Sequence, residues 1–108
     1  MNNKKRVLVV DDEPGILKFA SISLTIAGYE VITTTSGEEA LKLVESEKPD
    51  IMLLDIVMEP LSGFDVLFRL RRASNKMPVI VFTAQSMIAE SALSIGAKSY
   101  ISKPFMPE

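Results

Sequence analysis

Apolar and polar residues follow two alternating periods along this chain. Short runs of apolar or β-branched residues are bounded by turn formers and predict strands. Parallel strands that are covered on both faces read as continuous apolar runs, and VLVV, IMLL and VIVF are of this kind. The runs that predict strands lie at Val7–Val10, Glu30–Thr34, Ile51–Leu54, Val79–Phe82 and Tyr100–Ile101.

The segments between these runs have the apolar spacing of amphipathic helices. A first helix is indicated by an apolar face that runs from Ile16 to Ala27, with Pro14 suited to its first turn and Gly28 to its end. Ser36 and Glu39 have the spacing of a capping box ahead of a second helix. Two further helices are indicated by apolar stripes at Phe64, Leu67 and Leu70, with Arg71 beside them, and at Ile88, Ala92 and Leu93, the last helix ending at Gly96.

Strands that alternate with helices favour an α/β fold in which helices cover both faces of a parallel sheet. We therefore expect one domain over residues 1–108, a doubly wound five-stranded sheet without internal repeats or linkers. A mixed α+β fold is the alternative that the pattern leaves open.

Composition excludes several classes of function. The chain contains no cysteine and no histidine, which excludes disulfides, thiol catalysis, histidine acid–base chemistry and the usual zinc sites. The net charge of -2 gives no reason to expect nucleic acid or an anionic membrane as a partner. The basic clusters at Lys4–Arg6 and Arg69–Arg72 are interpreted as solvated faces. No apolar run reaches the ~20 residues of a membrane span and no signal peptide is recognisable, so a cytoplasmic location is expected.

Polar residues follow most of the predicted strands at the point where each strand ends. Asp11 and Asp12 follow the first strand, Asp55 the third and Thr83 the fourth, and Lys103 lies just past the fifth. The carboxyl ends of parallel strands meet at one edge of a sheet, where open α/β sheets bind their ligands. The sequence therefore predicts that three carboxylates, a hydroxyl and an ammonium group converge there.

Three carboxylates at one place repel each other unless a cation joins them, and Lys103 supplies only one positive charge. Mg²⁺ prefers such oxygen ligands and fits the remaining charge. A carboxylate can also act as a nucleophile toward phosphorus, and fixed positive charge with a hydroxyl donor is what phosphoryl transfer needs. Simpler interpretations stay open: Asp12 and Thr83 could merely cap the helices that follow them, and Tyr100 could be a core residue.

The motifs VLVVDDE, PDIMLLDIVM, SGFD, PVIVFTA and GAKSYISKPF occur in an order and spacing that resemble the receiver domain of two-component response regulators, including the chemotaxis regulators. The resemblance covers essentially the whole chain. It implies the flavodoxin-like strand order 2-1-3-4-5. It also implies a signalling switch rather than a classical enzyme, although a receiver catalyses its own phosphorylation and dephosphorylation.

The resemblance also assigns roles to the site residues. It implies that Asp55 is the phosphoacceptor and that Mg²⁺ is held by Asp11, Asp12, Asp55 and the backbone carbonyl of Val57. Lys103 would pair with the phosphoryl group. The phosphodonor implied is a sensor histidine kinase.

A switch pair follows from the same resemblance. Thr83 would turn its hydroxyl toward the phosphoryl group while Tyr100 rotates into the space left, so that a downstream protein or output domain reads the changed surface. The Lys103–Pro104 peptide bond is expected to be cis.

The chain departs from the family pattern beside the site. Glu59 occupies the position where the family commonly has proline, and Pro60 follows it. The segment from Thr83 to Gly96 is about two residues shorter than the motif spacing usual in the family. By the resemblance, Val57 and Gln85 occupy positions that set how readily water attacks the phosphoryl group. The apolar Val57 cannot orient a water and Gln85 is no strong base, so we expect moderate to slow loss of the phosphoryl group.

The sequence KPFMPE ends where the family's fifth helix would begin, so that helix and any output domain are expected to be missing. Truncation by design, a longer natural protein, and a short form that covers its apolar surface as a homodimer all stay open.

Two other functions stay open as well. One is a pseudo-receiver that is not phosphorylated and serves as a protein-interaction module. The other is a Mg²⁺-dependent phosphohydrolase, a class that by resemblance has an aspartate at the position of Val57.

Overall fold

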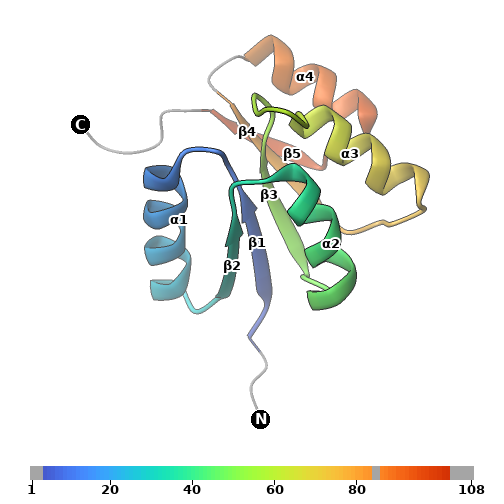
Figure 1. Ribbon diagram of the computed structural model, residues 1–108. Coiled ribbons are helices and arrows are strands. Elements are labelled where there is room, and N and C mark those ends of the chain that lie inside the picture. Colours follow the sequence, from blue (N-terminus) through green and yellow to red (C-terminus); the bar gives the residue numbers. More distant parts are fainter. Residues whose placement is uncertain (1–3, 84–85, 103–108) are drawn as a thin grey trace.

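The computed structural model describes residues 4–83 and 86–102, and within them strands and helices alternate (Figure 1). All strand pairs are parallel, in the order β2-β1-β3-β4-β5. This confirms the predicted sheet and the implied strand order. The strands are β1 (Arg6–Val10), β2 (Glu30–Thr34), β3 (Ile51–Asp55), β4 (Val79–Thr83) and β5 (Ser99–Ser102).

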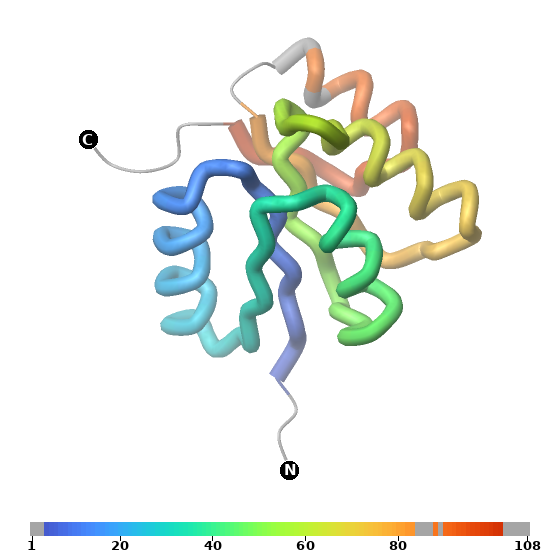
Figure 2. The backbone as a smooth tube through the Cα atoms, in the orientation of Figure 1, coloured from blue at the N-terminus to red at the C-terminus, as the bar shows by residue number. Residues whose placement is uncertain are grey.

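The helices lie on both faces of the sheet, as expected. They are α1 (Pro14–Ile26), α2 (Gly37–Glu47), α3 (Gly63–Arg72) and α4 (Ser86–Ile95). Figure 1 shows α1 on one face and the other three helices on the opposite face. The tube in Figure 2 follows the same course, in which β3 is the middle strand of the sheet and β1 lies between β2 and β3.

The side chains of the strands alternate between two cores, as the period of two in a strand requires. On the face of α2, α3 and α4, the core contains Leu8 and Val10 of β1 together with residues of β3 and β4. On the face of α1, Val7, Val9 and Phe82 pack against Leu17 and Ala20. Within the described residues, this second face also has an apolar groove of about 250 Å³ between α1 and the strands β3, β4 and β5.

The start of α1 at Pro14 agrees with the sequence prediction, but the start of α2 differs from it. The Ser36 hydroxyl accepts a hydrogen bond from the Glu39 amide (3.2 Å), but the Ser36 amide donates to the Thr34 hydroxyl (3.1 Å) instead of to Glu39. The capping box predicted there is therefore only half formed, because the end of β2 supplies a competing acceptor. A complete capping box forms at α3, where Ser62 and Asp65 each accept from the other's amide at 3.2 Å.

The α3 capping box gives a first prediction. Ser62→Ala should lower the free energy of unfolding by about 1 kcal/mol, because it leaves an amide of the first turn without its side-chain acceptor. Urea denaturation measures this change. Ser94→Ala, on the exposed surface of α4, is the matched control and should lower the free energy of unfolding much less. An equal loss in both variants would contradict a capping role for Ser62.

The amino edge of the sheet is held by Arg6. Its guanidinium lies 2.7 Å from the Glu47 carboxylate and 3.2 Å from that of Glu30, and its amide donates to Asp50 (2.7 Å). The hydrogen bond to Glu47 is the main cause that raises the pKa of Arg6. Within the basic cluster Lys4–Arg6, Arg6 keeps 30% of its side chain exposed and also ties β2 and α2 to β1 through these surface ion pairs.

Candidate functional site

Asp11 and Asp12 follow β1 at the carboxyl edge of the sheet. Asp11 is fully buried, and its amide donates to Thr34 (3.2 Å), which extends the pairing of β1 with β2. One Asp11 carboxylate oxygen accepts from the Glu13 amide (2.8 Å), just before α1 begins. Asp12 is exposed. The two neighbours thus differ: one is fixed by the backbone around it, and the other faces solvent.

Asp55 is the last residue of β3 and is 3% exposed. Its carboxylate accepts from the Val57 amide at 3.4 Å, so the turn after the strand orients it. A buried carboxylate needs compensating partners. Its position at the end of a central strand agrees with the sequence prediction.

The three carboxylates meet. Oxygen atoms of Asp11, Asp12 and Asp55 lie within 4.8 Å of one another, and Glu59 is not part of this group among the described residues. Oxygens on opposite sides of a Mg²⁺ ion are about 4.2 Å apart, given metal–oxygen distances of about 2.1 Å. The acidic cluster Asp11/Asp12/Asp55 therefore fits a hard divalent cation after small side-chain rotations, and such a cation would relieve its repulsion.

Thr83 ends β4 beside this cluster. Asp55 pairs with Phe82 in the sheet register, so Thr83 lies one residue beyond the partner of Asp55, and it is 3% exposed. Thr83 pairs in turn with Ser102, the last residue of β5. Lys103, which follows Ser102, lies outside the described residues. The strand register therefore places Thr83 at the carboxyl edge of the sheet, as the sequence predicts.

Tyr100 lies in the middle of β5, paired with Val81, and is 39% exposed. This exposure argues against the simpler interpretation of Tyr100 as a buried core residue. Gln85 and the Lys103–Pro104 bond were also assigned from the sequence, and both lie outside the described residues.

The loop after β3 carries Val57 and Glu59, which are both exposed; Val57 is 57% exposed. The Glu59–Pro60 peptide bond is cis. The apolar Val57 side chain faces solvent, where it has no group that could orient a water molecule.

Gly63 is a site residue to which the sequence analysis gave no role. It is buried at the start of α3, and its amide donates to the Ile56 carbonyl (2.8 Å). A Cβ atom added at Gly63 would lie 2.2 Å from the carbonyl oxygen of Asp55 and 2.7 Å from the Cα of Ile56. Helix α3 thus packs directly against the backbone of Asp55, which only glycine allows. The SGFD motif was the available signal.

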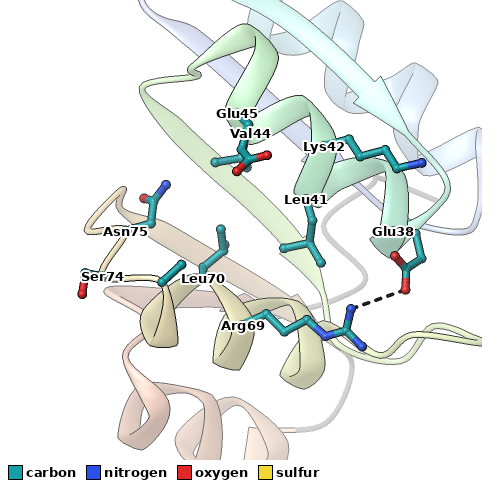
Figure 3. Close-up of a pocket in the computed structure, with 10 residues that line it drawn as sticks. Glu38, Leu41, Lys42, Val44, Glu45, Arg69, Leu70, Ser74 and Asn75 are labelled. Atoms are coloured by element: carbon teal, nitrogen blue, oxygen red, sulfur yellow. Dashed lines mark hydrogen bonds and ion pairs between the residues drawn. The ribbon is translucent and has the colours of Figure 1, made fainter.

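A separate groove of about 510 Å³ lies between α2 and α3 (Figure 3). Its floor includes Leu41 and Leu70, and Glu38 and Arg69 form an ion pair (3.5 Å) at its rim. None of the residues that line it belongs to the acidic cluster. The groove is therefore not part of the candidate site.

Comparison with protein families gives one result for almost the whole chain. The family model described as "Response regulator receiver domain" matches residues 7–108. No helix within the described residues has the length and apolar character needed to cross a membrane.

Curated relatives are similar over nearly all of this chain. A probable transcriptional regulator, ycf27, of Porphyra purpurea is 43% identical over 109 residues, which cover 99% of this chain and 44% of the relative. The alkaline phosphatase synthesis transcriptional regulatory protein PhoP of Bacillus subtilis is 41% identical over 105 residues, covering 95% and 44% of the two chains. The chain therefore spans less than half the length of these relatives.

Solved structures have the same fold. The chemotaxis protein CheY4 of Vibrio cholerae superposes with a TM-score of 0.88 at 31% identity, covering 96% of this chain and 90% of that one. The response regulator protein TrrA of Thermotoga maritima, solved in complex with Mg²⁺ and BeF, superposes with a TM-score of 0.86 at 40% identity, covering 94% and 88%.

Proposed function

Because the chain belongs to the response regulator receiver domain family, we propose that it is a phosphoacceptor switch in which the Asp55 side chain takes up the phosphoryl group. The observation that carries this proposal is the acidic cluster, in which buried Asp55 lies within 4.8 Å of the carboxylates of Asp11 and Asp12. The domain is a signalling domain rather than a classical enzyme.

In the proposed reaction, a carboxylate oxygen of Asp55 attacks the phosphorus atom of the donor. The bond from phosphorus to the donor atom breaks, its electron pair leaves with the donor, and Asp55 becomes an acyl phosphate. Thr83 would donate its hydroxyl hydrogen to a phosphoryl oxygen and Lys103 would pair with the phosphoryl charge. Mg²⁺, held by Asp11, Asp12, Asp55 and the Val57 carbonyl, would neutralise charge on the phosphoryl oxygens.

The signal would leave through α4 and β5. The buried Thr83 and the half-exposed Tyr100 on neighbouring strands suit a pair in which movement of one side chain makes room for the other. We propose a sensor histidine kinase as phosphodonor and a cytoplasmic location. The names of the ycf27 and PhoP relatives support an output in transcription, carried by a part of the protein outside this chain.

The proposal is tested by asking whether phosphorylation of the chain requires Mg²⁺. Incubation with acetyl phosphate should add the mass of one phosphoryl group only when Mg²⁺ is present, and EDTA should prevent the gain. Asp12→Asn should slow the gain roughly 100-fold, because the cluster loses a charged ligand of the cation. Intact-protein mass spectrometry follows the reaction.

Glu45→Gln is the matched control, since it removes one exposed carboxylate on α2 away from the cluster. It should react like the parent chain. Equal rates with and without Mg²⁺ would contradict the metal site. No mass gain at all in the folded protein would support the interaction module instead.

Exposed Val57 gives a prediction for the lifetime of the phosphoryl group. With no polar group there to orient water, the acyl phosphate should persist for minutes or longer after acetyl phosphate is removed. Val57→Asn should shorten this lifetime about tenfold, because an amide can hold the attacking water. Val57→Ala, which adds no polar group, should leave it unchanged. A half-life of seconds in the parent chain would count against this account.

A further inference from the structure

Arg71, the second-last residue of α3, connects the ends of two helices. Its Nη2 and Nε donate to the carbonyl oxygen of Gly96, at 2.8 and 3.3 Å. Its Nη1 donates to the carbonyls of Asn75 (2.8 Å) and Met77 (3.1 Å) in the segment between α3 and β4. The interpretation of Arg69–Arg72 as a solvated face is therefore wrong for Arg71, which is half-buried and binds backbone carbonyls.

The backbone conformation of Gly96 and its lack of a side chain allow this contact. It lies just past α4 with φ +125°, where its amide donates to the Ala92 carbonyl (3.1 Å) and so closes the helix. A Cβ atom at this position would come within 2.9 Å of the Arg71 Nε. Two residues later, the Lys98 amide donates to Val79 and the chain enters β5. The guanidinium therefore sits at the corner where α4 turns into β5.

The chemistry of arginine suits it to hold the end of α4 and the start of β5 in one position. Arginine presents a rigid planar fork of donors, so a guanidinium that bridges several carbonyls holds them in one geometry. A cation at the carboxyl ends of helices also interacts favourably with their dipoles, and Arg71 lies at this end of both α3 and α4. Figure 2 shows the traces of these two helices side by side.

The neighbouring arginines do not have this role. Arg69 forms an ion pair with Glu38 of α2, and the Arg72 guanidinium lies 5.8 Å from the ring centre of Phe68 on its own helix. Among the three, only Arg71 has a described contact with the α4–β5 corner.

The other end of α4 begins three residues after Thr83, at the edge that carries the acidic cluster. We propose that Arg71 holds the α4–β5 corner as a pivot, so that phosphorylation of Asp55 swings the amino-terminal end of α4 while the corner stays in place. This inference rests on the proposed function, because it concerns how the signal from Asp55 spreads. Arg71 is a positioning residue in this scheme, remote from the reacting atoms.

Spin-label distances test the pivot. The chain has no cysteine, so introduced cysteine pairs at Lys18 and Glu90 and at Lys18 and Lys98 give unique labels on exposed positions of α1, of α4 and beyond the corner. With Mg²⁺ and beryllofluoride, the distance from position 18 to position 90 should change by about 2 Å, the scale of helix shifts, and that to position 98 should stay within about 1 Å.

Variants separate a pivot from a purely structural contact. In Arg71→Ala the distance to position 98 should also change by about 2 Å when beryllofluoride binds, a response that loss of stability alone does not produce. Arg72→Ala removes the same charge one residue away and should behave like the parent chain. If Arg71→Ala does not fold, Arg71→Lys takes its place, because lysine keeps the charge but lacks the planar set of donors. The distance from position 18 to position 98 should then change on binding beryllofluoride, as in Arg71→Ala.

The outcomes distinguish the two proposals. The pivot is overturned if the label at position 98 moves as far as that at position 90 in the parent chain, if neither moves, or if Arg71→Ala leaves position 98 in place. A fluorine NMR signal of bound beryllofluoride that needs Asp55 would leave the phosphoacceptor standing in each of these cases. Absence of that signal would defeat the phosphoacceptor proposal and the pivot with it.

Discussion

An Asp55→Asn variant is expected to take up phosphoryl groups from acetyl phosphate at no more than about one-thousandth of the parent rate, the scale of removing a nucleophile. The amide has no anionic oxygen to attack phosphorus. Asparagine has nearly the shape of aspartate, so the end of β3 and the amide contact from Val57 should persist. The rate is measured by intact mass against time, with Mg²⁺ present.

The control for this variant is Asp50→Asn, which removes an exposed carboxylate at the amino edge of the sheet, where Asp50 accepts from the Arg6 amide. It should be phosphorylated at the parent rate. A phosphoryl group gained by Asp55→Asn in amounts close to those of the parent would mean that the acceptor is another residue.

Gly63→Ala should destabilise the fold by about 3 kcal/mol or more and disable phosphorylation as well. The added methyl group would lie 2.2 Å from the Asp55 carbonyl oxygen and 2.9 Å from its carbonyl carbon. The obstacle is backbone rather than a flexible side chain, so either α3 or the end of β3 must move. Asp55 ends β3 and α3 packs on its backbone, so movement of either element disturbs the acceptor position. The substitution should therefore lower both the free energy of unfolding, measured by urea denaturation, and the uptake of phosphoryl groups from acetyl phosphate.

Two other glycines provide graded controls. At Gly15, on the exposed first turn of α1, an added methyl group would meet no atom within 4 Å other than its chain neighbours and the backbone of its own helix. Gly15→Ala should therefore be neutral or stabilise the fold by up to about 1 kcal/mol. At Gly37 the atom nearest to an added methyl group is a methyl carbon of Val66 at 3.0 Å. Gly37→Ala should therefore lower the free energy of unfolding by an amount between those of the other two variants. If Gly63→Ala were as stable as Gly15→Ala, the close packing of α3 on Asp55 would be wrong.

The sheet was predictable because buried parallel strands leave a strong local signal. The apolar runs at Val7–Val10, Ile51–Leu54 and Val79–Phe82 lie within β1, β3 and β4. The approach of Asp11 and Asp12 to Asp55 followed from one rule, that parallel strands end at the same edge. The strand order itself came from family resemblance, because the local spacing of apolar residues does not determine which strands pair.

Other features depend on tertiary contacts that a local pattern does not contain. The capping box at Ser36 was only half right because Thr34, at the end of another element, competes for an amide. The need for Gly63 arises from the approach of a helix to a strand end. Arg71 looks like its neighbours in the sequence, and the carbonyls of Asn75, Met77 and Gly96 that surround it in the fold give it a different role.

The most direct test of the central claim is to locate the phosphoryl group. The chain is phosphorylated with acetyl phosphate and Mg²⁺, reduced with borohydride, which converts an aspartyl phosphate to homoserine, and digested for peptide mass mapping. We predict homoserine at position 55 alone. Homoserine at Asp11 or Asp12, or a stable phosphate on a serine or threonine with Asp55 unchanged, would contradict the assignment of Asp55 as the phosphoacceptor.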